Sequence, residues 1–170
     1  MLKRTAQTTR RKRRDESEKP LHVASLRTAR AKMMAARFKR TYGTHKVHFL
    51  GKESDKALRR LCLDLQSIGI TVKEKIDEKL PGLCLEEFPG PPEIFDLSET
   101  CEFQRRAFEI FSAYDFAVVH LESAWLHKVV PDGSHASHIV NCERRIHEIL
   151  SRIAKGCAEE DPLALSSLCH

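Results

Sequence analysis

Three soft side chains near residue 140 are the first candidates for chemistry. His135, His138 and Cys142 are spaced i, i+3 and i+7, and His147 follows them. On a helix these groups would lie near one face, and imidazole together with thiolate favours zinc. The sequence offers no fourth ligand, however, and Cys142 also belongs to an apolar stripe. We therefore expect surface histidines at the start of a capped helix, with neither a metal nor a cofactor.

Nucleophilic and phosphate-binding motifs are missing from the sequence. It contains no GxSxG, P-loop, GxGxxG or HExxH pattern, and no Cys-His or Ser-His-Asp set can be assigned to a pocket. His120 and His127 are seven residues apart, and we expect hydrogen-bonded core histidines there rather than catalytic bases. The sequence therefore predicts a protein that is not an enzyme.

The chain has six cysteines, which is compatible with three disulfides in fifteen connectivities. Cys84 and Cys101 lie on either side of a proline-rich stretch. They are our candidate disulfide, which would fix that stretch to the helix after it and contribute roughly 3 kcal/mol. In a reducing compartment the two cysteines would instead be small buried apolar side chains.

Positive charge is concentrated at the N-terminus, where residues 1–50 hold 15 of the 29 Lys and Arg but only 3 of the 24 acidic residues. We predict a basic arm, disordered over 1–20, with a basic helix over 21–41 capped at Ser25. Nucleic acid, an anionic membrane surface or an acidic partner would suit such an arm, and a solvated leader is the alternative. The basic patch comprises Arg10, Arg11, Lys12, Arg13, Arg14, Arg27, Arg30, Arg37, Lys39 and Arg40. The thin apolar face expected on the helix comprises Leu26, Ala29, Met33 and Ala36.

Residues 51–156 are predicted to form a helical bundle domain, so the fold class is all-α. Apolar residues recur every three or four positions from 54 to 80, which indicates an amphipathic helix with a bend near Gly69. Four prolines between 81 and 92 then exclude regular helix and predict a long packed crossover. A third strong helix should run from Ser134 to a C-cap at Gly156. Residues 157–170 are predicted to be a flexible tail.

The most apolar stretch of the chain lies between Cys101 and Trp125. At helical spacing its apolar side chains cover more than half of the helix, which is typical of a central helix with a cap at Asp96 or Ser98. Trp125 is the only tryptophan. It is either a core residue or a candidate interface anchor, because tryptophan is enriched at binding surfaces.

Membrane and export signals are absent from the sequence as written. No stretch approaches the ~18 apolar residues of a membrane span, so we expect no span. The basic N-terminus is not followed by an apolar run of the kind that a secretory signal requires.

The order of these segments resembles a known family. A long amphipathic helix ends in Glu78-Lys-Leu-Pro-Gly-Leu-Cys-Leu85, and the crossover Phe88-Pro-Gly-Pro-Pro92 leads to a strongly apolar helix. Over residues 54–155 this layout is similar to the long-chain four-helix cytokines of the interleukin-6, interleukin-12 and interleukin-27 alpha-subunit type. The resemblance implies a secreted, up-up-down-down bundle without an active site. Such a protein binds a cytokine receptor chain or a second subunit through its helix faces.

We expect this chain to differ from that pattern, because its sequence predicts neither a signal peptide nor a fourth long helix after residue 156. The basic helix at 21–41 is one candidate for the missing packing. The alternative function is an intracellular helical adaptor, nuclear or cytoplasmic, whose basic arm binds nucleic acid or directs the protein to the nucleus.

Overall fold

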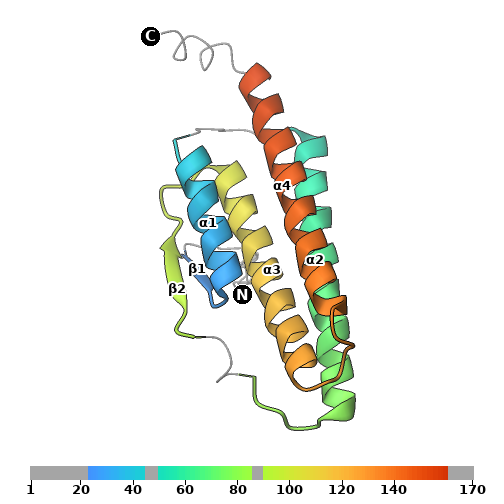
Figure 1. Ribbon diagram of the computed structural model, residues 1–170. Helices are drawn as coiled ribbons and strands as arrows, with labels where there is room; N and C mark the ends of the chain where they lie inside the picture. The colour runs from blue at the N-terminus through green and yellow to red at the C-terminus, as the bar shows by residue number, and fades with distance from the viewer. Residues whose placement is uncertain (1–22, 45–49, 86–89, 161–170) are drawn as a thin grey trace, which may run out of the picture.

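The computed structural model describes residues 23–44, 50–85 and 90–160, with side chains described to residue 156. These residues are mainly helical, as the sequence predicted, with one small sheet added (Figure 1). The elements are β1 (Val23–Leu26), α1 (Ala29–Tyr42), α2 (Lys52–Lys79), β2 (Glu93–Asp96), α3 (Glu102–Leu126) and α4 (Ser134–Glu160). The three long helices that apolar periodicity predicted are thus present.

Helix α3 is the centre of the molecule. It packs against α1, α2, α4 and β1, and 16 of its 25 residues are buried. Side chains that point to different sides of the helix, such as Phe103, Phe108 and Ala113, are all buried. A helix that is apolar around most of its girth is stable only when other elements cover it on several sides. The sequence-based expectation of a central helix is therefore confirmed.

Among the described elements, helices α2 and α3 share the most extensive contact, and Gly69 allows them to approach each other closely. A Cβ atom at Gly69 would overlap the ring of Phe116 and approach the Cα of Ala117 to 3.3 Å. α2 runs unbroken through this position, and the glycine serves the close approach of the two helices.

Replacing Gly69 with alanine should destabilise the protein by about 1–2 kcal/mol, because overpacking outweighs the gain in helix propensity. Gly156 is a matched control, since it lies in α4, is exposed, and would have no heavy atom within 4 Å of an added Cβ. There the same substitution should stabilise by up to about 1 kcal/mol. Urea unfolding of the two variants measures both effects, and equal stabilisation by both would contradict the close approach at Gly69.

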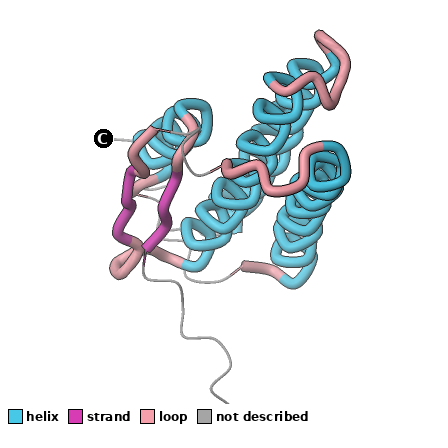
Figure 2. Tube along the Cα trace, turned by 90° about the horizontal axis from the view of Figure 1, so that it is seen from below, coloured by secondary structure: helices cyan, strands magenta, loops and turns pink. Residues whose placement is uncertain are grey.

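A two-stranded antiparallel sheet corrects the prediction for the start of the basic helix and adds a strand to the connection between α2 and α3. Val23 pairs with Asp96 and Leu26 with Glu93, so residues 23–26 are strand and not helix. Ala24 and Leu26 are buried while Val23 is exposed, the period-2 pattern of a half-buried strand. The sheet also places the second half of the crossover against the helices, at one side of the molecule (Figure 2).

Helix α1 belongs to the core, although the sequence predicted a surface helix on an arm. Its first turn is capped by Thr28, whose side chain accepts a hydrogen bond from the Ala31 N–H, and not by Ser25. Ala31, Ala35 and Phe38 are buried in the same core cluster as α2, α3 and α4. The apolar face is therefore not the predicted one: Ala29, Met33 and Ala36 of that set are exposed, and only Leu26, in β1, is buried. The boundary drawn at residue 50 does not separate two cores.

Two helix ends also differ from the prediction. The N-cap of α3 is Cys101, whose thiol accepts from the N–H of Gln104 while the Gln104 side chain accepts from the Cys101 N–H at 3.1 Å. Asp96 and Ser98 lie before this cap. Helix α4 continues through Gly156 to Glu160, so the first residues of the predicted tail are helical. The other tail residues and residues 1–22 lie outside the described part of the chain.

The colour gradient of Figure 1 gives the direction of each helix. α2 and α3 run the same way, although they follow each other in the sequence, and α1 and α4 run the opposite way. Two consecutive parallel helices need a long connection between them, and here it includes β2 and the non-helical residues 80–85 that follow α2.

Candidate interaction surfaces

A buried carboxylate fixes the start of α1 on the central helix. Asp115 of α3 is 5 % exposed. Its Oδ1 accepts from the N–H and the hydroxyl of Thr28, both at 2.7 Å, and its Oδ2 accepts from the N–H of Arg27 at 2.8 Å. Because the donors belong to the turn between β1 and α1, this side chain determines where α1 lies.

A second polar contact joins three helices. Glu143 of α4 accepts from the Tyr114 hydroxyl of α3 at 2.6 Å and from the Arg30 guanidinium of α1 at 3.0 Å. Burial, together with the hydrogen bond to Glu143, raises the pKa of Tyr114 far above its ordinary value. Tyr114 is therefore a neutral hydrogen-bond donor at all physiological pH values. This contact closes one end of the space between α1 and α4.

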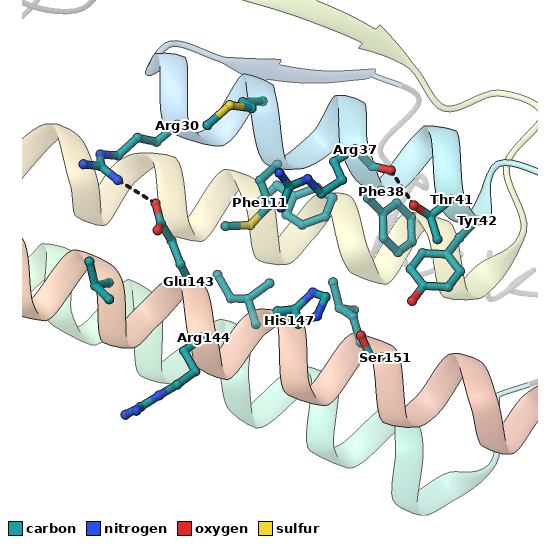
Figure 3. A pocket seen from close by; sticks show the side chains of 15 residues that line it. Arg30, Arg37, Phe38, Thr41, Tyr42, Phe111, Glu143, Arg144, His147 and Ser151 are labelled. Atoms are coloured by element: carbon teal, nitrogen blue, oxygen red, sulfur yellow. Dashed lines mark hydrogen bonds and ion pairs between the residues drawn. The ribbon is translucent and has the colours of Figure 1, made fainter.

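Beyond this contact an open groove runs between α1 and α4 (Figure 3). Both helices pack on α3, and the groove between them has a volume of about 410 Å³. Its floor consists of buried side chains, among them Phe38, Phe111 and Ile146. Met33 and Val140 on its rim are 63 % and 54 % exposed. The lining residues are Arg30, Met33, Met34, Arg37, Phe38, Thr41, Tyr42, Phe111, Val140, Glu143, Arg144, Ile146, His147, Leu150 and Ser151.

One wall of this groove carries an unpaired positive charge. Arg37 of α1 and His147 of α4 extend into the gap from opposite sides, while the guanidinium of Arg144 points away from α1 (Figure 3). Among the described residues, no acidic side chain forms an ion pair with Arg37 or His147. The one carboxylate in the lining, Glu143, already accepts from Tyr114 and Arg30. The groove thus offers an apolar floor, with the unpaired guanidinium of Arg37 on its α1 wall.

A second exposed apolar area lies on the outer face of α2. Leu63 and Ile70 are two helical turns apart and are 64 % and 49 % exposed. Ile70 also lines a shallow hollow between α2 and α3 with Cys62 and Phe116. The Cys62 thiol donates to the Glu109 carbonyl at 3.8 Å, and burial raises the pKa of that thiol. It is therefore a packed side chain and not a reactive thiolate.

The structure divides the predicted basic patch. Residues 10–14 lie outside the described part of the chain. Arg27, Arg37, Lys39 and Arg40 are exposed. Arg30, by contrast, is paired with Glu143 at 3.0 Å, and of the patch only Arg30 and Arg37 line the groove.

The predicted disulfide is not formed in the structure. Cys84 and Cys101 are both thiols, and no disulfide joins the cysteines that the structure describes. Cys84 is exposed, whereas the sulfur of Cys101 caps α3. Cys101 therefore caps a helix, a role that the sequence did not indicate.

Trp125 was considered either a core residue or an interface anchor, and the structure places it between these two roles. Its ring stacks on His135, with 4.6 Å between centroids and 13° between planes, and its indole N–H donates to Asp132 at 3.0 Å. The side chain is partly exposed at the end of α3. These contacts hold the loop before α4, and the role as an interface anchor stays a prediction.

The histidines that the structure describes lie on α3 and α4 or in the segment between them. His120 is buried and its Nδ1–H donates to the Phe116 carbonyl at 2.7 Å. Burial lowers the pKa of His120 despite that hydrogen bond. His138 is exposed and Cys142 is buried. In the part of the chain that the structure describes, no three His, Cys, Asp or Glu side chains are grouped so that they could hold a metal ion.

Comparisons with protein-family models, with curated protein sequences and with solved structures each found no match to this chain. None of the helices in the described ranges is both long enough and apolar enough to span a membrane.

Sequence reasoning did not find the residues that shape the groove. Asp115 is the one acidic residue between Glu109 and Glu122 in an otherwise apolar run, and that isolation was a usable signal of a buried, hydrogen-bonded carboxylate. Met33, by contrast, was predicted to lie on the thin apolar face of a basic surface helix, and nothing in that pattern indicated that it would lie on the rim of a groove.

Proposed function

We propose that the chain is a non-enzymatic helical ligand of the long-chain cytokine type, which binds a cell-surface receptor chain through its helix faces. The layout of the helices supports this proposal. α2 and α3 are parallel and joined by a long crossover, and α4 returns in the opposite direction. α1, which also runs opposite to α2 and α3, packs on α3 with Ala31, Ala35 and Phe38 buried. It would take the place of the fourth helix in an up-up-down-down-like bundle.

The observation that carries the proposal is the pair of exposed apolar side chains on α2. Leu63 and Ile70 lie on one helix face, and half-buried Phe116 of α3 lies beside Ile70. Exposed apolar residues that are grouped on a helix face and surrounded by polar ones are typical of protein-binding surfaces. In this proposal the α2–α3 face contacts the receptor chain, and the protein is secreted.

The intracellular alternative also has an observation in its favour. Arg27, Arg37, Lys39 and Arg40 stay exposed after α1 has packed on the core. A basic surface of this kind could bind phosphate groups of a nucleic acid, in the nucleus or the cytoplasm, with an affinity that falls steeply with salt.

Binding of the fluorescently labelled full chain to intact cells tests the proposal. We expect saturable binding that excess unlabelled chain displaces. The double variant Leu63→Glu, Ile70→Glu should lose at least about 10-fold in affinity, because charge is then placed in the apolar contact. Leu126→Glu is the matched control, since Leu126 is 50 % exposed but lies at the far end of α3.

Two outcomes would overturn the receptor proposal. One is the absence of saturable binding to every cell type of a panel that spans blood, epithelial and stromal lineages. The other is binding that duplex DNA displaces and that disappears as salt rises from roughly 50 mM to 200 mM, which is the nucleic-acid behaviour.

A further inference from the structure

We propose that the groove between α1 and α4 binds one amphipathic helix of a partner protein, with acidic residues flanking the apolar face of that helix. The proposal does not depend on the receptor surface on α2 and α3, because the groove is formed by other helices. It rests on the shape, the lining and the charge of the groove.

The shape fits a helix better than a small molecule. The groove follows the gap between two helices that pack on α3 (Figure 3). Met33 and Val140 on its rim are more than half exposed, whereas small-molecule sites enclose roughly 70–90 % of the ligand surface. An open apolar channel of this kind is the usual receptor for the apolar face of an amphipathic helix.

The lining favours the same partner. Met33 and Met34 both face the groove, and they are two of the three methionines in the chain. Methionine side chains are flexible and polarizable, and they recur on surfaces that accept amphipathic helices. Below them, Phe111 and Ile146 are buried and form a fixed floor. The apolar anchors of a docked helix would lie on this floor.

The charge of the groove favours a partner helix of negative charge. Arg37 and His147 extend into the gap, and within the described residues neither forms an ion pair with an acidic group. Glu143 is already satisfied by Tyr114 and Arg30. Carboxylates on the edges of a docked helix would therefore meet the uncompensated guanidinium of Arg37, and the His147 ring could donate an N–H to them, whereas lysines would be repelled by Arg37.

Fluorescence anisotropy with the full chain and two labelled peptides tests this inference. Both peptides are about 15 residues long, with leucines repeating every three or four positions. The other positions carry mainly glutamate in one peptide and mainly lysine in its twin. We expect saturable binding of the glutamate peptide, at least about 10-fold tighter than the lysine peptide, and weaker with added salt.

Variants of exposed residues locate the binding. Val140→Glu should reduce affinity for the glutamate peptide by at least about 10-fold, and Arg37→Glu should reverse the preference between the two peptides. Arg40→Glu and Leu126→Glu are the controls: Arg40 lies on α1 outside the groove lining, and Leu126 lies at the end of α3 with an exposure similar to Val140. Because all four residues are exposed, circular dichroism should show the same helix content in every variant.

Four outcomes would overturn the inference. The two peptides could bind equally, or the control variants could lose as much affinity as Val140→Glu. Tighter peptide binding by a chain that ends at Glu160 would assign the groove to residues 161–170 of the protein itself. A dimer that Val140→Glu converts to a monomer would assign it to a second copy of the chain.

Discussion

Replacement of Asp115 by alanine should destabilise the protein by roughly 3–5 kcal/mol. The carboxylate is 5 % exposed and accepts three hydrogen bonds from Arg27 and Thr28. Its removal leaves two backbone N–H groups and a hydroxyl without an acceptor, and each buried unsatisfied donor costs about 1–3 kcal/mol. Since typical domains are stable by only about 5–15 kcal/mol, much of the total stability would be lost. Urea unfolding followed by circular dichroism measures the change.

Two further substitutions make this prediction specific. Asp115→Asn keeps one carbonyl oxygen for Thr28 but places an NH₂ group against the Arg27 N–H. It should therefore lower the free energy of unfolding, but by less than Asp115→Ala does. Asp132→Ala removes a carboxylate that accepts from Trp125 and is 75 % exposed, and it should cost less than about 1 kcal/mol. Amide exchange should accelerate at Thr28 and along α1 in Asp115→Ala. A loss of stability without faster exchange in α1 would contradict the role that we assign to Asp115.

The long helices could be predicted from the sequence because their information is local. In α2, Leu58, Leu61 and Leu65 repeat at helical spacing and are all buried, and α3 is apolar around most of its surface. For such segments the spacing of the apolar residues predicts both the helix and the face that is buried.

The small sheet and the groove could not be predicted, because both depend on contacts between distant residues. Strands of four residues carry almost no periodic signal, and β1 pairs with residues about seventy positions later, as in Ser25 with Ile94. The position of α1 depends on Asp115, which is 87 residues away from Thr28. The role of Met33 on the groove rim depends on such contacts and could therefore not be predicted.

The predicted arm and the observed core make opposite predictions for Phe38. Its side chain is 5 % exposed and its ring lies 5.1–5.5 Å from those of Tyr42, Phe103 and Phe111. Phe38→Ala should therefore cost roughly 3–5 kcal/mol, the usual range for a buried phenylalanine. If residues 21–50 were a separate arm, the rest of the chain would unfold at the same urea concentration as before.

Tryptophan fluorescence distinguishes these cases, because Trp125 is the only tryptophan and lies at the opposite end of α3 from Phe103. A fall in the Trp125 unfolding midpoint on Phe38→Ala would mean that α1 unfolds together with the long helices. Met33→Ala on the same helix is the control, since Met33 is 63 % exposed and should shift stability by less than about 0.5 kcal/mol. An unchanged midpoint in Phe38→Ala would restore the boundary at residue 50. It would also remove α1 as a fixed wall of the groove, so this result constrains every function that depends on the α1–α4 surface.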